Sequence, residues 1–285
     1  MILTVTLNAA LDITYQVDTL HPGHTHRVQD VHTRPGGKGI NVADVLTQLG
    51  EPVRATGLAG PEINLPDFVP INHPTRRTTT ILTPDGTATL FNEPGPRIST
   101  GEWATFLDHY DTLTPHATVV VLSGSLPPGI PTDAYAHLIT RTDTPVILDT
   151  DGDPLRHGLN ARPALIKPNQ HELERLLGHT PHLPHDCREL GVPVAATLGA
   201  DGAVLSTPDG CWTVRPPHPV TGNPTGAGDA FTAALARGLT HRKPWPHILA
   251  DAAALSAAAV AAPHAGAYHP DLYRELTNLV DVKEG

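Results

Sequence analysis

Residues Thr118–Leu122 read TVVVL, a run of β-branched and apolar side chains without polar alternation. Such a run is typical of a strand that is buried on both faces in a parallel sheet. Comparable short runs lie on either side of it along the chain: Ile2–Leu7, Val53–Leu58, Val146–Leu148, Ala164–Ile166 and Val194–Leu198. The chain therefore contains several candidate strands for one buried parallel sheet.

Segments with helical periodicity separate these strands. Ile40, Ala43, Leu46 and Leu49 recur at helical spacing, and the Ala-rich stretch Ala252–Ala262 is typical of a tightly packed helix. Alternating strands and helices predict an α/β fold, a doubly wound and mostly parallel sheet flanked by helices, with ligands outside the carboxyl ends of the strands. No linker is long enough to separate two domains, so we expect residues 1–285 to form a single domain.

Four further segments, arranged as two pairs along the chain, alternate between apolar and polar residues. Ile13–Val17 and Arg27–Val31 flank a turn at Pro22-Gly23, and Thr78–Leu82 and Thr87–Phe91 flank the turn Pro84–Gly86. Both patterns predict antiparallel hairpins with one face toward water. We expect them to form a small antiparallel β lid, built from about residues 13–32 and 76–92, that projects from the main domain.

Composition excludes several classes of protein. The formal net charge of −10 at pH 7 argues against a nucleic-acid binder, which needs a basic surface. No stretch of 18 apolar residues could span a membrane, and the amino-terminal run lacks the basic region of a signal peptide. With two cysteines, a disulfide scaffold is not expected. These features predict a cytoplasmic protein whose anionic ligands bind in a focused site.

The motif NPTGAGDAF, Asn223–Phe231, is the most specific signal for chemistry. Gly226, Ala227 and Gly228 can direct successive backbone N–H groups into one concavity at a helix start, where negative charge is stabilised. Asp229 is then placed to accept a proton from an attacking hydroxyl. The alternative interpretation is a glycine-rich helix start with an acidic residue in its first turn.

A second glycine-rich motif, RPGGKGINVA, spans Arg34–Ala43. Gly37 allows close backbone approach to a ligand, Lys38 can meet a phosphate, and Asn41 can bridge sugar hydroxyls. The motif is not a Walker A loop, because a glycine follows the lysine, and it lacks the spacing of a dinucleotide fingerprint. The alternative is a plain glycine turn before an amphipathic helix.

With these two motifs in this order, the sequence resembles the PfkB group of ribokinase-like sugar kinases over nearly its whole length. The similarity is greatest to the branch that contains 1-phosphofructokinase and tagatose-6-phosphate kinase. The resembling stretches are Thr6–Asp12, Gly36–Ala43, Asn92–Pro96, Ser123–Gly129, Lys167–Glu172, Leu198–Gly202 and Asn223–Phe231.

The resemblance implies roles for residues that hold a phosphorylated sugar. Asp12, Gly37 and Asn41 match positions that bind the sugar hydroxyls, and Ser125 would face the sugar. Arg76 matches an arginine that binds the phosphate already present on the substrate, and Arg27 on the first hairpin matches another. An arginine suits this role because its guanidinium can bind phosphate with two parallel hydrogen bonds.

The resemblance also implies the nucleotide site, with ATP and Mg²⁺ as cofactors. Asn169 and Glu172 would organise Mg²⁺, largely through water, and Lys167 heads the same motif as a nucleotide-site residue. Thr197 and Gly199 match positions near the nucleotide phosphates and ribose, and Ser256 one near the adenine. Gly226, Ala227 and Gly228 become the anion hole, and Asp229 the catalytic base.

The expected reaction is ATP-dependent phosphorylation of a sugar phosphate, with fructose 1-phosphate giving fructose 1,6-bisphosphate. Tagatose 6-phosphate and fructose 6-phosphate are alternative acceptors. An alternative from another class is a non-catalytic sensor that binds a sugar phosphate. The apolar faces of the lid strands predict a homodimer that forms through the lid.

Some positions depart from the family pattern. Ala9 replaces a proline, Asp44 stands where arginine is common, and Thr78 replaces an asparagine. Only Pro61–Asp67 precede the strand Phe68–Ile71, which is too short for a helical crossover between parallel strands. Either the sheet has lost a helix there or residues are missing from the sequence.

The eighteen histidines raise the alternative of a metal site, in particular His21, His24, His26 and His32 near the first hairpin. Zinc sites need three or four convergent ligands, usually at a helical or knuckle spacing. A solvated, histidine-rich rim of the lid is the competing interpretation.

Overall fold

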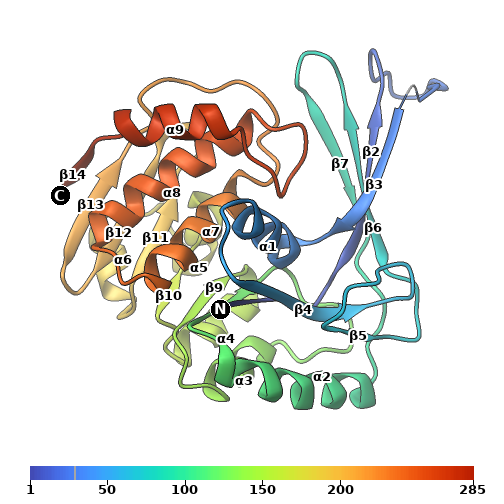
Figure 1. The fold of residues 1–285 in the computed structure, drawn as a ribbon, viewed down its shortest axis with the longest axis horizontal. Helices are drawn as coiled ribbons and strands as arrows, with labels where there is room; N and C mark the ends of the chain where they lie inside the picture. Colours follow the sequence, from blue (N-terminus) through green and yellow to red (C-terminus); the bar gives the residue numbers. More distant parts are fainter. Residues whose placement is uncertain (29) are drawn as a thin grey trace.

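The computed structural model describes residues 1–28 and 30–285. Within these residues, ten strands form one main sheet with helices on both faces, and a four-stranded sheet projects from it (Figure 1). The predicted α/β architecture with a projecting lid is confirmed.

The main sheet has the strand order β14-β13-β12-β11-β10-β9-β8-β1-β4-β5. Its parallel part contains β5 (Phe68–Pro70), β4 (Val53–Ala59), β1 (Ile2–Thr6), β8 (Val119–Ser123), β9 (Val146–Asp149), β10 (Leu165–Ile166) and β11 (Val194–Thr197). Three antiparallel strands follow: β12 (Ala203–Thr207), β13 (Gly210–Val214) and β14 (Val282–Glu284). In the sheet, β4 lies on one side of β1, and β8, which follows later in the chain, lies on the other side of β1. Strand order therefore reverses beside β1, where open α/β sheets bind ligands.

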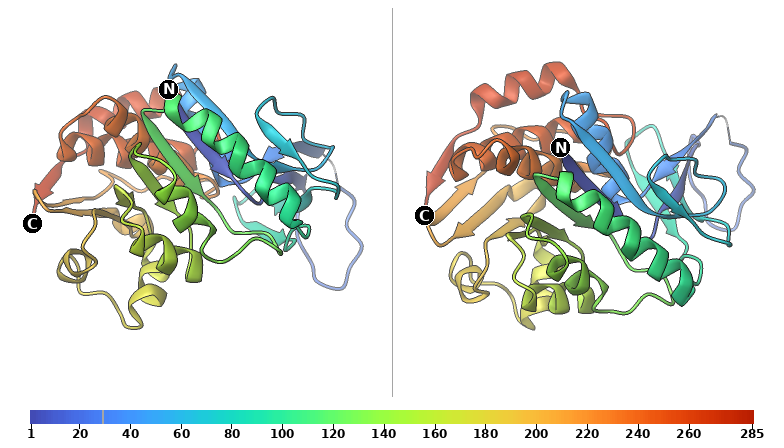
Figure 2. Two further views of the ribbon diagram at one scale, coloured as in Figure 1. Left: turned by 90° about the horizontal axis from the view of Figure 1, so that it is seen from below. Right: turned by 60° about the horizontal axis from the view of Figure 1, so that its bottom comes forward.

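Successive side chains of the central strands enter two different cores. Val120 and Leu122 pack with α2 (Thr100–Leu113), α3 (Ala134–Thr140), α4 (Gly152–Asn160), α5 (Gln170–Leu177) and α6 (His185–Glu189). Val119 and Val121 pack with α1 (Lys38–Gln48), α7 (Ala227–Thr240) and α8 (Trp245–Val260) on the opposite face. Figure 2 shows the two helical layers from other directions. This two-sided burial explains why TVVVL lacks polar alternation.

The remaining helical elements lie at the margins of the main sheet. α9 (Pro270–Leu279) packs on α8 through Leu276 and Ala254. Two short 3-10 turns, η1 (Thr114–His116) and η2 (Gly199–Asp201), follow α2 and β11. Among the residues described, none of the helices combines the length and apolarity that a membrane span requires.

The lid contains β2 (Ala10–Gln16), β3 (Asp30–Gly36), β6 (Arg76–Leu82) and β7 (Ala88–Asn92), in the order β3-β2-β6-β7. Each hairpin is antiparallel as predicted, and the two hairpins join through a parallel pairing of β2 with β6. The lid is thus a mixed sheet built from two antiparallel hairpins.

The strand predicted at Arg27–Val31 is misplaced. β3 begins at Asp30 and runs to Gly36, while Arg27 lies in the connection before it and Gln29 lies outside the described residues. The prediction assumed a tight turn at Pro22-Gly23. The actual pairing places Gln16 opposite Asp30, so the connection is longer and the paired segment begins later.

The connection from β4 to β5 contains no helix. β5 pairs in parallel only with the last residues of β4, from Gly57 opposite Phe68 to Ala59 opposite Pro70. The chain therefore returns over a short distance, which a loop can span. Ile63 in this loop packs against Ala59 in a small core cluster. The absence of a helix between β4 and β5 agrees with both interpretations of the short segment Pro61–Asp67, a lost helix or residues missing from the sequence.

Candidate active site

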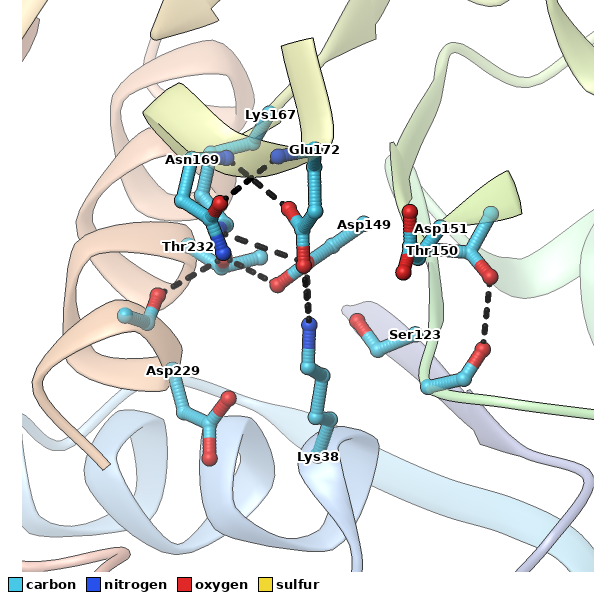
Figure 3. A network of polar contacts seen from close by, with 12 residues as sticks. Lys38, Ser123, Asp149, Thr150, Asp151, Lys167, Asn169, Glu172, Asp229 and Thr232 are labelled. Atoms are coloured by element: carbon cyan, nitrogen blue, oxygen red, sulfur yellow. Dashed lines mark hydrogen bonds and ion pairs between the residues drawn. The ribbon is translucent and has the colours of Figure 1, made fainter. Parts of the chain in front are cut away.

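Most of the predicted site residues lie where the carboxyl ends of the parallel strands meet the amino-terminal ends of α1, α5 and α7, and Figure 3 shows those around Asp229. Two groups can be distinguished. One surrounds Asp229 in the first turn of α7, and the other joins the base of the lid to the segments that follow β1 and β8.

Asp229 lies in the first turn of α7 and is 7% exposed. Asn41 Nδ2 on α1 donates a hydrogen bond to its Oδ2 at 2.7 Å. Burial raises the pKa of Asp229 to about 6, against the lowering effect of Lys38 and of the Asn41 hydrogen bond, while Asp149 adds to the rise. A carboxylate with this pKa is ionised at neutral pH yet basic enough to accept a proton.

The start of α7 has the backbone conformation expected of an anion hole. Gly226 has a φ of 90° and precedes the helix, and a Cβ there would lie 2.6 Å from Ala265 Cα. Only glycine fits this conformation and this close contact. Ala227 N donates to Pro224 O at 3.2 Å, whereas the N–H groups of Gly228 and Asp229 precede the first intrahelical bond.

Asp149 is a central residue that the sequence interpretation missed. Its carboxylate is fully buried at the end of β9, and its Oδ1 lies 2.8 Å from Lys38 Nζ and 3.4 Å from Lys167 Nζ. Thr232 Oγ1 donates to its Oδ2 at 2.9 Å (Figure 3). Although burial acts to raise it, the pKa of Asp149 is lowered by the two lysines. Its place directly after the run Val146–Leu148, at the carboxyl edge of the sheet, was a usable signal.

Lys38, predicted to meet the substrate phosphate, has carboxylate partners within the chain. Besides Asp149, Glu172 Oε1 lies 3.9 Å from its ammonium. Burial alone would lower the pKa of Lys38, but Asp149, Glu172 and Asp229 raise it above its ordinary value. Lys38 is therefore a cation held in place by carboxylates of the site, and its contact with a substrate phosphate stays a prediction.

Asn169 and Glu172 form a capping box at the start of α5. Asn169 Oδ1 accepts from Glu172 N at 2.9 Å, and Glu172 Oε2 accepts from Asn169 N at 2.8 Å. Thr197 at the end of β11 lies beside this motif, because its N–H donates to Pro168 O at 3.0 Å. The structure thus brings together Asn169, Glu172 and Thr197.

The other predicted nucleotide residues lie further along the same side. Gly199 is exposed in the turn η2 that follows β11. Ser256 is half-buried on α8, which packs against α7, β12 and β13. Their contact with a nucleotide stays a prediction.

The second group links the lid to the main sheet. Arg76 at the start of β6 donates from Nε to Asn8 O and from Nη1 to Glu93 O, each at 3.2 Å. Asn8 in turn donates from Nδ2 to Ser125 Oγ at 3.0 Å. A cavity of about 630 Å³ lies against Arg76, Glu93 and Leu11. The predicted substrate residues Arg76 and Ser125 thus lie on either side of Asn8.

Asp12 on β2 lies near Arg34 and Arg76. Burial raises its pKa above the ordinary value, whereas Arg34 and Arg76 act to lower it. Its carboxylate needs Gly36 as a neighbour, because a Cβ at Gly36 would lie 2.1 Å from Asp12 Cγ. Gly37 immediately precedes α1 and packs against Thr6. The RPGGKG motif therefore shapes this part of the site through close backbone approach.

Arg27 does not join either group in the described chain. It is exposed in the connection between β2 and β3, which Figure 1 shows at the tip of the lid, away from the main sheet. A contact of Arg27 with the substrate of its own chain would require a different lid position.

The hairpin histidines do not form a three-ligand group in the part of the chain that is described. His26 Nε2 accepts from His21 N at 2.8 Å, and His32 Nε2 lies 2.9 Å from Asp30 Oδ2. A group that could hold a metal occurs elsewhere, at His185, Asp186 and Glu189 on α6. The structure therefore gives no support to a metal site in the lid hairpin.

Comparison with known proteins agrees with this geometry. The family model described as pfkB family carbohydrate kinase matches residues 5–62 and 64–272. The solved structure of phosphofructokinase-2 from Escherichia coli, in complex with potassium, is similar with a TM-score of 0.89 and 25% identity, covering 97% of this chain and 98% of that one.

Two further solved structures show the fold. A possible 1-phosphofructokinase from Thermotoga maritima has a TM-score of 0.89 at 23% identity, covering 100% of this chain and 99% of that one. Ribokinase from the same organism has a TM-score of 0.78 at 20% identity, covering 97% and 99%. The chain belongs to the pfkB carbohydrate kinase family. It is a sugar kinase, a phosphotransferase with an alcohol group as acceptor, and the family implies ATP as donor.

Proposed function

We propose that this pfkB-family kinase transfers the γ-phosphoryl group of ATP directly to a hydroxyl of a sugar phosphate, with Asp229 as catalytic base. The observation that carries the proposal is the buried Asp229 carboxylate at the glycine-rich start of α7, hydrogen-bonded to Asn41 at 2.7 Å. Burial gives this group a pKa of about 6, which suits a base that works near neutral pH.

Each part of the site has a role in the proposed transfer. Asp229 accepts the proton of the attacking hydroxyl, while the N–H groups of Gly228 and Asp229 face the charge on the transferring group. Asp12 and Asn41 orient the sugar through its hydroxyls. Lys38 and Lys167, fixed by Asp149, supply positive charge below the phosphates. Closure of the lid excludes water, which would otherwise compete as acceptor.

The residues near α5 fit Mg²⁺. When ionised, the carboxylates of Asp149, Glu172 and Asp229 outnumber the two ammonium groups of Lys38 and Lys167, so the cluster keeps a negative charge that favours a cation. Glu172 Oε1 is free of the capping box, and oxygen donors are what Mg²⁺ prefers. Glu172 and Asn169 would hold the ion, largely through water. When bound, Mg²⁺ neutralises charge on the nucleotide phosphates.

The proposed acceptor is fructose 1-phosphate, which rests on the motifs Gly36–Ala43 and Asn223–Phe231. A second candidate is fructose 6-phosphate. Phosphofructokinase-2 from E. coli has been solved in complex with fructose-6-phosphate, and that structure is 26% identical to this chain with a TM-score of 0.87. Tagatose 6-phosphate is a third acceptor of the same size and charge. Arg76 at the base of the lid suits the phosphate of any of them.

The buried Asp229 argues against a non-catalytic sensor. Burial of an ionised carboxylate costs stability, and a protein that only binds sugar phosphate does not need a base. The deciding experiment is a screen of ADP formation with fructose 1-phosphate, fructose 6-phosphate, tagatose 6-phosphate and unphosphorylated sugars. We expect one sugar phosphate to exceed the others in kcat/KM by at least about tenfold. No ADP formation with any of them, together with sugar-phosphate binding, would identify a sensor.

The same screen with Asp229→Asn tests the base. This variant should nearly abolish turnover and leave ATP binding largely unchanged, because the carboxylate accepts a proton but does not hold the nucleotide. Calorimetric titration with ATP provides the control for folding. Turnover at the unmodified rate would show that another group is the base.

A further inference from the structure

Arg34 on the lid strand β3 reaches across to α1 and makes three polar contacts there and on β2. Its Nη1 donates to Asp44 Oδ2 at 3.1 Å, and its Nη2 donates to Asn41 Oδ1 at 2.5 Å and to Asp12 Oδ2 at 3.4 Å. The side chain is 24% exposed. Neither the sequence motifs nor the family resemblance gives Arg34 a role.

The position of Arg34 is closely fitted. A Cβ on Gly266, in the segment before α9, would lie 3.1 Å from both Arg34 Nη1 and Asp44 Oδ2. Gly266 is itself held by Gln48, whose Nε2 donates to Gly266 O at 2.6 Å. The guanidinium is thus enclosed by β2, α1 and this segment, so its direction is fixed by packing as well as by charge.

The contact with Asn41 has a consequence for the base. A guanidinium can only donate hydrogen bonds, so the atom of Asn41 that faces Arg34 must be the carbonyl oxygen. The amide nitrogen then points the other way, where it donates to Asp229 Oδ2 at 2.7 Å. Without Arg34, the Asn41 amide could turn over and present its oxygen to a protonated Asp229 instead.

We propose that Arg34 is a positioning residue for the catalytic base: it fixes the orientation of the Asn41 amide, so that Asn41 donates to Asp229 and favours its ionised form. This inference rests on the proposed role of Asp229. Arg34 belongs to β3 and pairs there with Asp12 of β2. The relay, meaning the hydrogen bonds from Arg34 through Asn41 to Asp229, therefore connects the base to the lid. A lid displacement that withdraws Arg34 would lower the ionised fraction of Asp229 at a given pH near its pKa.

Other charged groups lie around Asp229 and Arg34, and those around Asp229 must stay in place when Arg34 is replaced. Asp229 is faced by Lys38 of α1, Asp149 of β9 and Lys167 after β10. Arg34 is faced by Asp12 and Asp44, which are in turn near Arg76 and His264 respectively. Replacing Arg34 leaves the three groups around Asp229 in place, so a change in Asp229 would come through Asn41.

The test measures the titration midpoint of Asp229 in the free protein and does not require turnover. Protein labelled with [4-¹³C]aspartate is titrated by NMR, and the signal that is absent from Asp229→Asn identifies the residue. In Arg34→Met we expect the titration midpoint of Asp229 to rise by about one pH unit, since the hydrogen bond to its ionised form is lost. Arg34→Lys should stay near the unmodified midpoint, because an ammonium group also only donates.

Arg141→Met is the matched control, since it removes an arginine that is ion-paired with Asp111 of α2, a helix that packs on the other face of the main sheet from α7. It should leave the Asp229 midpoint unchanged. If Arg34→Met does not fold, Asp44→Ala loosens the anchor of Arg34 and should shift the midpoint in the same direction. A folded Arg34→Met whose Asp229 midpoint equals that of the unmodified protein would overturn the proposal.

Kinetics separate this role from direct binding of the substrate. In Arg34→Met, the acidic limb of the pH profile of kcat/KM should shift to higher pH by the same interval as the NMR midpoint. An increased KM for the sugar phosphate with an unmoved limb would instead identify Arg34 as a substrate ligand. An unmodified protein that is inactive toward every sugar, yet shows the NMR shift, would refute the proposed function and leave the relay intact.

Discussion

The carboxylate of Asp229 links burial to activity at the scale of a single residue. Its pKa is raised to about 6 by burial, and a base acts only when ionised. We therefore expect kcat/KM to fall about tenfold per pH unit below about pH 6 and to level off above it. A pH–rate profile measures this limb. A limb near pH 4, at the ordinary value of an aspartate, would show that burial does not tune this group.

Arg76 gives a second prediction at the same scale. Its guanidinium is oriented by two backbone carbonyls, Asn8 O and Glu93 O, which leave part of its donor set for a ligand. Arg76→Ala should raise the KM for the sugar phosphate about tenfold to a hundredfold, from the loss of a charge-assisted hydrogen bond. The KM for ATP should change little. Equal increases for both substrates would indicate a general structural defect.

Two capping boxes allow a comparison at the scale of the element. Asn169 caps α5 at the site, and Ser99 caps α2 on the outer helical layer, each with a glutamate three residues later. Replacing either cap with alanine should cost about 1 kcal/mol of stability. Asn169→Ala should also lose most activity, because it removes the side chain proposed to help hold Mg²⁺, whereas Ser99→Ala should keep it. Thermal melts and kcat measure both. Equal activity in the two variants would show that Asn169 acts only as a cap.

The lid shows how strand register gives a sheet two different faces. Asp12 lies opposite Arg34 and Thr78, and these polar residues share the face that the site occupies. Ile13 lies opposite Thr79, which lies opposite Phe91, on the other face. Val31 joins this second face through Tyr15. One face of the lid therefore serves the site, and the other is largely apolar.

At the scale of the whole molecule, the apolar lid face agrees with the homodimer that the sequence predicts. Val31 and Phe91 on it are 53% and 57% exposed, and the face projects beyond the main domain (Figure 1). Such a surface is stabilised when a second lid covers it. Phosphofructokinase-2 from E. coli has been solved in a tetrameric form, which shows that this related kinase assembles.

Val31→Asp combined with Phe91→Asp should convert the dimer to a monomer, because two buried carboxylates would oppose association. Val17 is not suitable for this purpose, since it is already buried within one chain. Leu90→Asp is the matched control: Leu90 is also exposed on β7 but points to the opposite face. Light scattering gives the masses. An unmodified protein that is monomeric and fully active at micromolar concentration would exclude the lid dimer.

Local pattern was enough to predict most of the parallel strands of the main sheet and to select Asp229 as the candidate base. Burial on both faces removes polar residues from a parallel strand, so TVVVL could be interpreted without knowledge of its neighbours. A glycine-rich helix start followed by Asp229 is equally local, because backbone conformation and first-turn position are set within a few residues. For the same reason the two antiparallel hairpins were predictable as pairs.

Contacts between distant segments determine the side-chain partners in the site and the strand register of the lid, which local sequence pattern does not specify. Asp149 gains its role from Lys38 and Lys167, and Arg34 from Asn41, which lies on a different element. The start of β3 and the parallel joining of β2 to β6 depend on register across strands, which the sequence of one strand does not specify. The charge, burial and hydrogen-bond partners of these side chains exist only once the chain has folded, and the chemistry of the site depends on them.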